Sequence, residues 1–566
     1  MSLRSALRPF ASSTLLRLAL SMVLAGYTAF PATRAEAFGT PAMLKNIAPG
    51  AAASTPQGFL KVGTKLVFFA DDGSHGIEPW VSDGTPLGTF MLRDIQSGPG
   101  GGFNPGCPEC NAVSNGSIAY FSGFDGTSGS QLWRTDGTTA GTFKVSANSV
   151  ASGLAVVGAN VYFTGNGGLL YKSDGTDAGT GSVSATPPAF SAGYGITDVN
   201  GTVFFPGSDG FSGVELWKTD GTQGGTVRVK DLNPGSANAG LGSLTNVGGV
   251  LYFTGTNGPV AGLFRSDGTS AGTVLVKAIG INAGDADHPQ IVGVGNTAYC
   301  IAYDAASGVE LWKSDGTALG TVLVKDIYPG DGPGIPSGNA GTGLVAIGST
   351  VYFRAADATH GYELWKSNGT EAGTVMVRDI NSANFGGSTP ASLANVDGTL
   401  FFRAMSSFAA GTQPWTSDGT SAGTVQLSSI YPANNSAAAS FKQVNGTIFF
   451  SADDGTNGIE LWSLASPLLA VDPPVADLLE RLELSPANPN PATSNTRIAY
   501  TLPISERATL RLFDVRGRAV RTLIDEEQSA GRHSLRLDAR GLASGVYFVK
   551  LEAGSIVRQR KVVLQR

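Results

Sequence analysis

The chain has 566 residues, of which 78 are glycine and only 14 % are charged. Glycine at this level without a collagen period predicts many short strands joined by tight turns. Residues 37–471 hold 19 Lys and Arg against 32 Asp and Glu, whereas residues 472–566 hold 15 against 11. The acidic balance of the larger part argues against nucleic acid as a partner, because phosphate binding needs a basic surface.

The first 37 residues have the pattern of a secretory signal peptide. Positive charges at Arg4, Arg8 and Arg17 accompany the apolar stretch 18–30, and Ala35-Glu36-Ala37 fits a cleavage site. The apolar stretch is shorter than the roughly 20 residues of a membrane-spanning helix. An uncleaved membrane anchor is the alternative, and we expect no transmembrane span once the signal is removed.

Residues 38–466 repeat one phrase, whose clearest copy is GVELWKSDGTALGTVLVKDIYPG at 308–330. Its aromatic position recurs at intervals of 38 to 53 residues. That position holds all the tryptophans of the chain, with Tyr171 and Phe264 in the two other copies: Trp80, Trp133, Trp217, Trp312, Trp365, Trp415 and Trp462. A recurring interval of this size indicates a repeat architecture.

Each copy predicts four strands. The first strand ends in a dipeptide such as Asn200-Gly201 or Asn445-Gly446, which tolerates the positive φ angles of a type I′ hairpin turn. A second strand, a glycine-rich loop and the Glu-Leu-Trp strand follow. An Asp-Gly-Thr loop then leads to the last strand, as at 321–325. Four hairpin-linked strands in about 48 residues are typical of a β-propeller blade.

The two ends of the repeat array predict a split blade. The ninth copy stops after Trp462-Ser463, whereas MLKNIAPG at 43–50 matches the final strand of the other copies. Pairing the first strand with the last removes two exposed sheet edges. The fold is therefore predicted to be an all-β propeller of nine blades, or of eight if the short third copy at 161–183 forms none.

We interpret the recurrent residues as structural. A large aromatic side chain in every copy would pack blade against blade. In Asp315-Gly316-Thr317 the Asp can accept backbone N–H bonds and the Gly can adopt a positive φ. One carboxylate per loop is too few for a calcium cage of about 6–8 oxygen ligands. We therefore predict no catalytic, cofactor-binding or metal-binding residues.

The histidines point to no catalytic centre. His75 and His360 occupy a loop position where other copies have Ser212, Ser307 or Asn457, so we interpret it as a polar turn position. His288 follows Asp285 and Asp287 and is expected to be solvated, with a weak metal site as the alternative. His533 begins a predicted strand and is interpreted as structural.

The chain has three cysteines. Cys107 and Cys110 are expected to form a local disulfide, as an exported protein favours. Redox chemistry would require a helix start after the pair, and zinc binding a second pair of ligands. Cys300 replaces an aromatic residue within a strand, which indicates a buried apolar role.

After a linker at 467–484, residues 485–566 predict a second domain. The pattern changes from repeats to alternating strands at 497–502, 509–513, 520–524, 533–537, 546–551 and 557–564. This number of short strands in about 85 residues favours an Ig-like sandwich.

Both regions resemble known families. Residues 42–463 resemble the secreted bacterial repeat family named for its ELWxxDGT signature (hyalin-like repeats), which implies no particular activity. Residues 485–566 resemble the C-terminal sorting domain of the type IX secretion system, related to the Ig-like domain of flagellar hook-capping proteins. Its matching segments are Asn490-Pro491-Ala492, Ile498–Pro503, Asp514–Arg518, Ser544–Phe548 and Lys561–Leu564.

The sorting resemblance implies contact with the secretion machinery and passage to the outer-membrane surface or beyond. An ordinary Ig-like adhesion module is the alternative. We expect a non-catalytic binding or structural module without cofactors, whose extracellular ligand is a glycan or a protein. The alternative function is an exported hydrolase or lyase that acts on polysaccharide or peptide in the central channel of the ring.

Overall fold

The computed structural model of the protein describes residues 38–565 apart from short segments. These segments are residues 51, 104–110, 128, 150–151, 184–188, 191–194, 281–290, 331, 337–342, 384–385, 467–482, 486, 488, 503–505, 529–530 and 554–555. The chain divides into two compact units, the first ending at Ser466 and the second beginning at Pro467.

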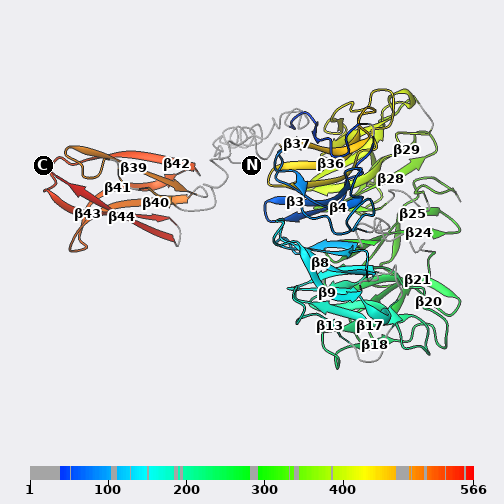
Figure 1. Cartoon of the computed structure of the whole chain (residues 1–566). Helices are drawn as coiled ribbons and strands as arrows, with labels where there is room; N and C mark the ends of the chain where they lie inside the picture. The colour runs from blue at the N-terminus through cyan, green and yellow to red at the C-terminus, as the bar shows by residue number, and fades with distance from the viewer. Residues whose placement is uncertain are drawn as a thin grey trace, which may run out of the picture. The chain divides into compact units, whose positions relative to one another are not determined.

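In the described part of the first unit, the strands form nine antiparallel sheets, here called blades 1 to 9 (Figure 1). Blades 1 to 4 contain in turn β2 (Gln57–Val62), β3 (Lys65–Asp71), β4 (Ile77–Ser82) and β5 (Phe90–Met91); β6 (Ala112–Ser114), β7 (Ala119–Phe124), β8 (Ser130–Thr135) and β9 (Phe143–Ser149); β10 (Ser152–Val157), β11 (Asn160–Thr164), β12 (Leu170–Ser173) and β13 (Gly181–Ser182); and β14 (Ala189–Phe190), β15 (Thr197–Val199), β16 (Thr202–Ser208), β17 (Glu215–Thr219) and β18 (Val227–Lys230).

Blades 5 to 9 contain in turn β19 (Gly242–Val247), β20 (Val250–Asn257), β21 (Val260–Ser266) and β22 (Val274–Lys277); β23 (Ile291–Val294), β24 (Thr297–Asp304), β25 (Gly308–Ser314) and β26 (Val322–Lys325); β27 (Val345–Ile347), β28 (Thr350–Asp357), β29 (Gly361–Ser367) and β30 (Val375–Arg378); β31 (Ala391–Val396), β32 (Thr399–Met405), β33 (Thr412–Ser417) and β34 (Val425–Gln426); and β35 (Ala439–Val444), β36 (Thr447–Asp453), β37 (Ile459–Ala465) and β1 (Ala42–Lys45). Two short 3₁₀ turns, η2 (Asn166–Gly168) and η3 (Phe408–Ala410), interrupt loops of blades 3 and 8. The short third copy thus forms a four-stranded sheet of its own, β10–β13.

The turns between the first and second strands of a blade have the predicted geometry. Asn200 and Gly201 have φ angles of 53° and 84°, and Asn445 and Gly446 have 47° and 75°. A type I′ turn requires positive φ at both central residues. The hairpin prediction is therefore confirmed at these positions.

The hydrophobic core of the first unit lies between neighbouring blades. Leu311 of blade 6 shares one buried cluster with Trp365 of blade 7, and Leu263 of blade 5 shares another with Trp312 of blade 6. Successive side chains on a strand point to opposite faces, so Leu311 and Trp312 pack against different neighbours. The Leu-Trp dipeptide of blade 6 thereby links it to blades 5 and 7.

The same contacts close the ring. Strand β1 pairs antiparallel with β37, with Ala42 opposite Ser463 and Met43 opposite Trp462. Leu461 of blade 9 packs in one cluster with Trp80 of blade 1. In Figure 1 the blue strands β3 and β4 lie beside the yellow β36 and β37, as the contact between β2 and β35 requires. The predicted propeller with a split blade is confirmed.

The second unit is a sandwich of two antiparallel sheets. Its strands are β38 (Glu483–Leu484), β39 (Asn495–Leu502), β40 (Glu506–Asp514), β41 (Ala519–Gln528), β42 (Gly531–Asp538), β43 (Gly545–Ala553) and β44 (Ile556–Leu564). The sheets have the orders β38-β39-β42 and β41-β40-β43-β44. Buried side chains of both sheets, such as Ile498, Leu510 and Val549, form one hydrophobic core. All six predicted strand segments fall within β39–β44.

Candidate functional site

The Glu of the repeated phrase holds the loop that leads to the next blade. Glu310 is fully buried, and its Oε1 accepts hydrogen bonds from the N–H groups of Ile327 (3.1 Å) and Tyr328 (3.0 Å). Glu363 accepts bonds from Ile380 (3.1 Å) and Asn381 (3.2 Å) in the same way. The sequence pattern alone does not reveal this role, although these four backbone partners follow their Glu by 17 or 18 residues.

In the split blade this contact joins the two ends of the propeller. Glu460 accepts hydrogen bonds from the N–H groups of Ile47 (2.8 Å) and Ala48 (3.2 Å) and from Oγ of Ser54 (2.7 Å). These partners are more than 400 positions away in the chain. The loop-holding Glu therefore also closes the ring.

Burial perturbs these carboxyl groups. Desolvation raises the pKa of Glu310 to about 8 and those of Glu78 and Glu215 to about 7. The hydrogen bonds that these carboxylates accept from backbone N–H groups favour the charged form, but they offset only part of this effect. A raised carboxyl pKa can indicate a catalytic acid. Here equivalent Glu carboxylates recur in several blades, and each accepts hydrogen bonds from the backbone of a loop. Their surroundings therefore indicate a structural role in holding these loops.

The Asp-Gly-Thr loops are closed by their own side chains. Oδ1 of Asp315 accepts hydrogen bonds from N–H (2.9 Å) and Oγ1 (2.8 Å) of Thr317, and these bonds lower the pKa of Asp315. Gly316 has a φ of 89°, a conformation that favours glycine. Asn368 makes the same bond to Thr370 in blade 7 (3.0 Å). The signature carboxylates of these loops are thus engaged in turn geometry.

The recurrent cations connect neighbouring blades. Lys313 of blade 6 donates to the carbonyl of Gly369 in blade 7 (2.7 Å). Lys325 donates to the carbonyl of Thr374 (3.0 Å) and lies 5.7 Å from the ring centre of Trp365. The same cation–aromatic contact recurs for Lys45 over Trp80, Arg93 over Trp133, Lys277 over Trp312 and Arg378 over Trp415. These cations therefore stabilise the ring.

The two histidines of the first unit that the structure describes lie in equivalent turns. Nδ1 of His75 is 2.8 Å from Asp72, and Nδ1 of His360 is 2.8 Å from Asp357. The hydrogen bond to Asp72 raises the pKa of His75. Ser212 bonds to Asp209 and Asn457 to Asp454 at the same place in blades 4 and 9, at 3.2 Å and 2.8 Å.

The remaining singled-out residues lie apart from one another. Cys300 is fully buried, and burial raises the pKa of its thiol to about 12. His533 stacks on Tyr500 in the second unit, with 5.1 Å between ring centres. His288, Cys107 and Cys110 lie outside the described residues. Within the described residues, no three His, Cys, Asp or Glu side chains are grouped so that they could hold a metal ion.

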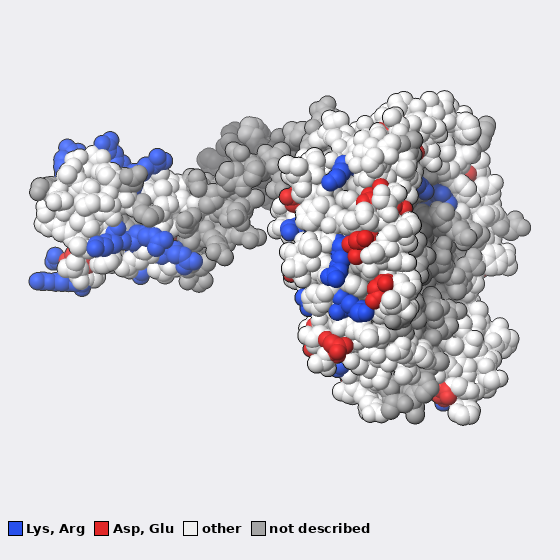
Figure 2. Space-filling view, viewed as in Figure 1, with Lys and Arg blue, Asp and Glu red and all other residues white. Residues whose placement is uncertain are grey.

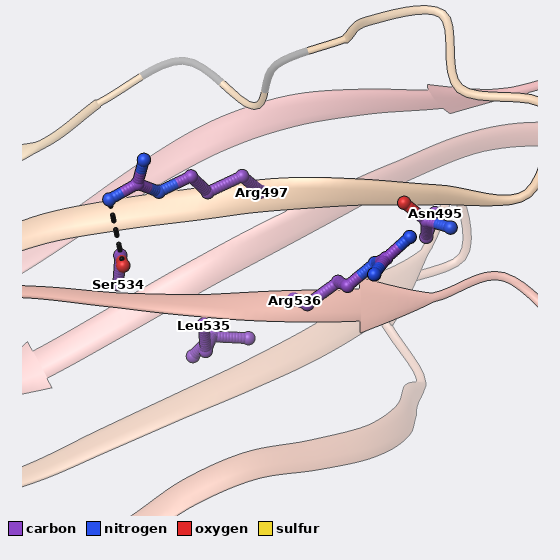
Figure 3. A pocket seen from close by; sticks show the side chains of 5 residues that line it. All are labelled: Asn495, Arg497, Ser534, Leu535 and Arg536. Carbon is purple, nitrogen blue, oxygen red and sulfur yellow. Dashed lines mark hydrogen bonds between the residues drawn. The ribbon is translucent and has the colours of Figure 1, made fainter.

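The second unit has an open pocket of about 330 Å³ on the outer face of β39 and β42. It is lined by Asn495, Arg497, Ser534, Leu535 and Arg536, and Arg497 donates to Oγ of Ser534 (3.0 Å; Figure 3). The two arginines stand opposite each other in the strand pairing, but their guanidinium groups point away from each other in Figure 3. They do not converge on one ligand position.

Figure 2 shows that Lys and Arg prevail on the visible face of the second unit, whereas the visible face of the first unit carries charges of both signs.

Solved structures resemble the chain only weakly. Puromycin hydrolase aligns with a TM-score of 0.35 and 12 % identity over 64 % of this chain and 61 % of the enzyme, so the chain spans about three fifths of that protein. BamB from Moraxella catarrhalis aligns with a TM-score of 0.32 and 13 % identity over 64 % of this chain and 93 % of its own. PorZ, a surface component of the type-IX secretion system of Porphyromonas gingivalis, aligns with a TM-score of 0.24 and 13 % identity, over 90 % and 75 %. At these TM-scores, none of the three transfers an activity to this chain.

One family comparison bears on export. Curated proteins give no match to the chain, and among the described residues no helix is long and apolar enough to cross a membrane. A family model described as a secretion system C-terminal sorting domain matches residues 487–565. The chain therefore carries a type IX sorting domain, which directs it out of the cell to the surface or the surroundings.

Proposed function

We propose that the protein is an extracellular binding or structural module without catalytic activity, in which a propeller of the ELWxxDGT-repeat type is exported by an Ig-like sorting domain. In this proposal residues 1–37 are a signal peptide, 38–466 the propeller, 467–484 a linker and 485–566 the sorting domain. Its partners are the secretion machinery and an extracellular glycan or protein.

The observation that supports a non-catalytic role is the use of the recurrent polar side chains. Glu310 holds a loop, Asp315 closes a turn, and Lys325 reaches the next blade. Each would be a plausible catalytic acid, ligand or base if it stood alone in a cleft. Because equivalents recur around the ring in the same contacts, their chemistry is accounted for by the fold.

The export half of the proposal is tested in the native host by removing residues 485–566. The truncated protein is expected to stay in the periplasm, whereas the full chain reaches the outer surface. Cell fractionation with a surface-protease assay measures this. Surface display of the truncated protein would contradict the sorting role.

The binding half is tested with the purified full chain on an array of glycans and extracellular proteins. Selective binding to one class is expected, with no turnover of the bound ligand. Release of a hydrolysed or eliminated product would contradict the non-catalytic assignment.

A further inference from the structure

Blade 8 departs from the repeat at several places that lie together in the structure. Its strand β33 reads TQPWTS, so Gln413 stands where most copies have the buried Glu. The loop before β33 contains the 3₁₀ turn η3, and the loop after β34 contains Asn434 and Asn435. These two loops are joined by the bond from N–H of Ser436 to the carbonyl of Thr412 (2.9 Å).

Gln413 explains why the two loops form one surface. The two N–H groups of its Nε2 face three carbonyls within hydrogen-bond distance, those of Ala410 (3.1 Å), Tyr431 (2.8 Å) and Asn434 (2.9 Å). Its Oε1 accepts from N–H of Ile430 (2.9 Å), as the repeat Glu would. A carboxylate can only accept hydrogen bonds, whereas a carboxamide also donates two. The change from Glu to Gln therefore ties both loops to one buried side chain, which is 1 % exposed.

This surface presents an aromatic ring that the turn does not need. Oγ of Ser407 accepts from N–H of Ala410 (3.2 Å), as Asp304 and Asp357 accept from the third residue of their loops. The next position holds Ala305 and Ala358 in those copies and Phe408 in blade 8. Phe408 is 86 % exposed, so it makes almost none of the apolar contact, worth about 1.5–3 kcal/mol, that burial of such a side chain provides.

The two joined loops, residues 406–411 and 427–438, have no charged side chain, so their polar groups are uncharged hydrogen-bonding groups. Asn434 and Asn435 are exposed, Oγ1 of Thr412 bonds to Asn435, and Oδ1 of Asn434 accepts from N–H of Asn435 (2.8 Å). Amides and hydroxyls offer both donors and acceptors, and an aromatic face offers an apolar platform. A sugar ring has the complementary chemistry, with an apolar C–H face and hydroxyl groups at its edge.

We propose that the loop surface of blade 8, formed by Phe408, Thr412, Asn434 and Asn435, binds neutral carbohydrate. This inference rests on the proposed binding function and specifies its ligand class. An acidic glycan would find no cation among these residues to offset its desolvation, whereas a neutral sugar loses little and gains the aromatic contact.

Phe211 of blade 4 provides a matched control. It is exposed to a similar degree, 84 %, and lies in the equivalent loop. Its loop, however, carries an ion pair between Asp209 and Arg228 (3.3 Å), and the facing loop of blade 4 holds Ala237-Asn238 where blade 8 holds Asn434-Asn435. Comparing Phe211→Ala with Phe408→Ala therefore distinguishes the general effect of removing an exposed Phe from the specific loss of the proposed binding surface.

The test uses the full chain from residue 38 and two variants, Phe408→Ala and Phe211→Ala. An array of neutral oligosaccharides, uronic-acid and sulfated oligosaccharides, and extracellular proteins is probed first, and calorimetric titration follows with the strongest neutral sugar. We expect neutral sugars to bind, with roughly tenfold or greater loss for Phe408→Ala and unchanged affinity for Phe211→Ala. Equal melting temperatures of the three proteins show that folding is not the cause.

Two results would overturn the inference alone: selective binding to acidic glycans or proteins, or neutral-sugar affinity that Phe408→Ala leaves unchanged. Either would leave the proposed binding function standing. Absence of binding to every probe would contradict both the inference and the binding function.

Discussion

Deletion of residues 42–49 should open the ring, because this segment supplies both the final strand and the final loop of blade 9. The deletion removes strand β1 from its pairing with β37. It removes the buried side chains of Leu44 and Ile47, which are 9 % and 4 % exposed. Burial of two such side chains stabilises by about 3–6 kcal/mol. Glu460 also loses the N–H groups of Ile47 and Ala48, and a buried acceptor that loses its partners costs about 1–3 kcal/mol.

The expected loss is comparable with the whole stability of a typical domain, about 5–15 kcal/mol. The unpaired edge of β37 would also be open to pairing with a second molecule. Urea unfolding, followed by tryptophan fluorescence, should therefore show a much lower midpoint, and size-exclusion chromatography should show oligomers. A truncated protein that unfolds at the parent midpoint and stays monomeric would refute the closure argument.

Three further predictions concern other parts of the chain. The pKa of Glu310 is raised from an ordinary 4.5 to about 8, so the folded state binds this proton more tightly than the unfolded state. The protonated carboxyl group therefore contributes its full share to the free energy of unfolding below about pH 4.5, and this contribution is lost as the pH rises to about 8. Glu310→Gln should therefore flatten the fall in the free energy of unfolding, measured by urea titration, between pH 5 and pH 8 by up to about a few kcal/mol, and an unchanged fall would contradict this. His75→Ser should leave the melting temperature and any measured binding unchanged, because Ser212 fills the same turn position (3.2 Å to Asp209); loss of binding in the folded variant would give His75 a functional role. A protein ending at Ser466 should unfold cooperatively in circular dichroism, because blade 9 takes its missing strand from β1; an unfolded product would show that the propeller depends on the second unit.

The sequence alone determined the features that depend on local patterns. Strand alternation, the positive-φ dipeptides such as Asn200-Gly201 and the recurrent Trp position each reflect backbone and side-chain preferences within a few residues. Repetition then made the blade visible, because the same local pattern returned throughout the first unit. Even the split blade was predictable, since the segment at 43–50 repeats a strand that the ninth copy lacks.

Only the tertiary structure decided which partners the polar side chains take. The sequence contained Glu310 and Ile327 at a fixed interval, but not the fold of the loop that brings the N–H of Ile327 to the carboxylate (3.1 Å). The meeting of Lys325 with Trp365 depends on how one blade faces the next. The surface around Phe408 likewise depends on Gln413, whose amide joins two loops about 20 residues apart. Hydrogen bonds and ring contacts need atoms placed within a few ångströms in a defined direction, and that placement comes from the packing of the blades, which no local pattern in the sequence encodes.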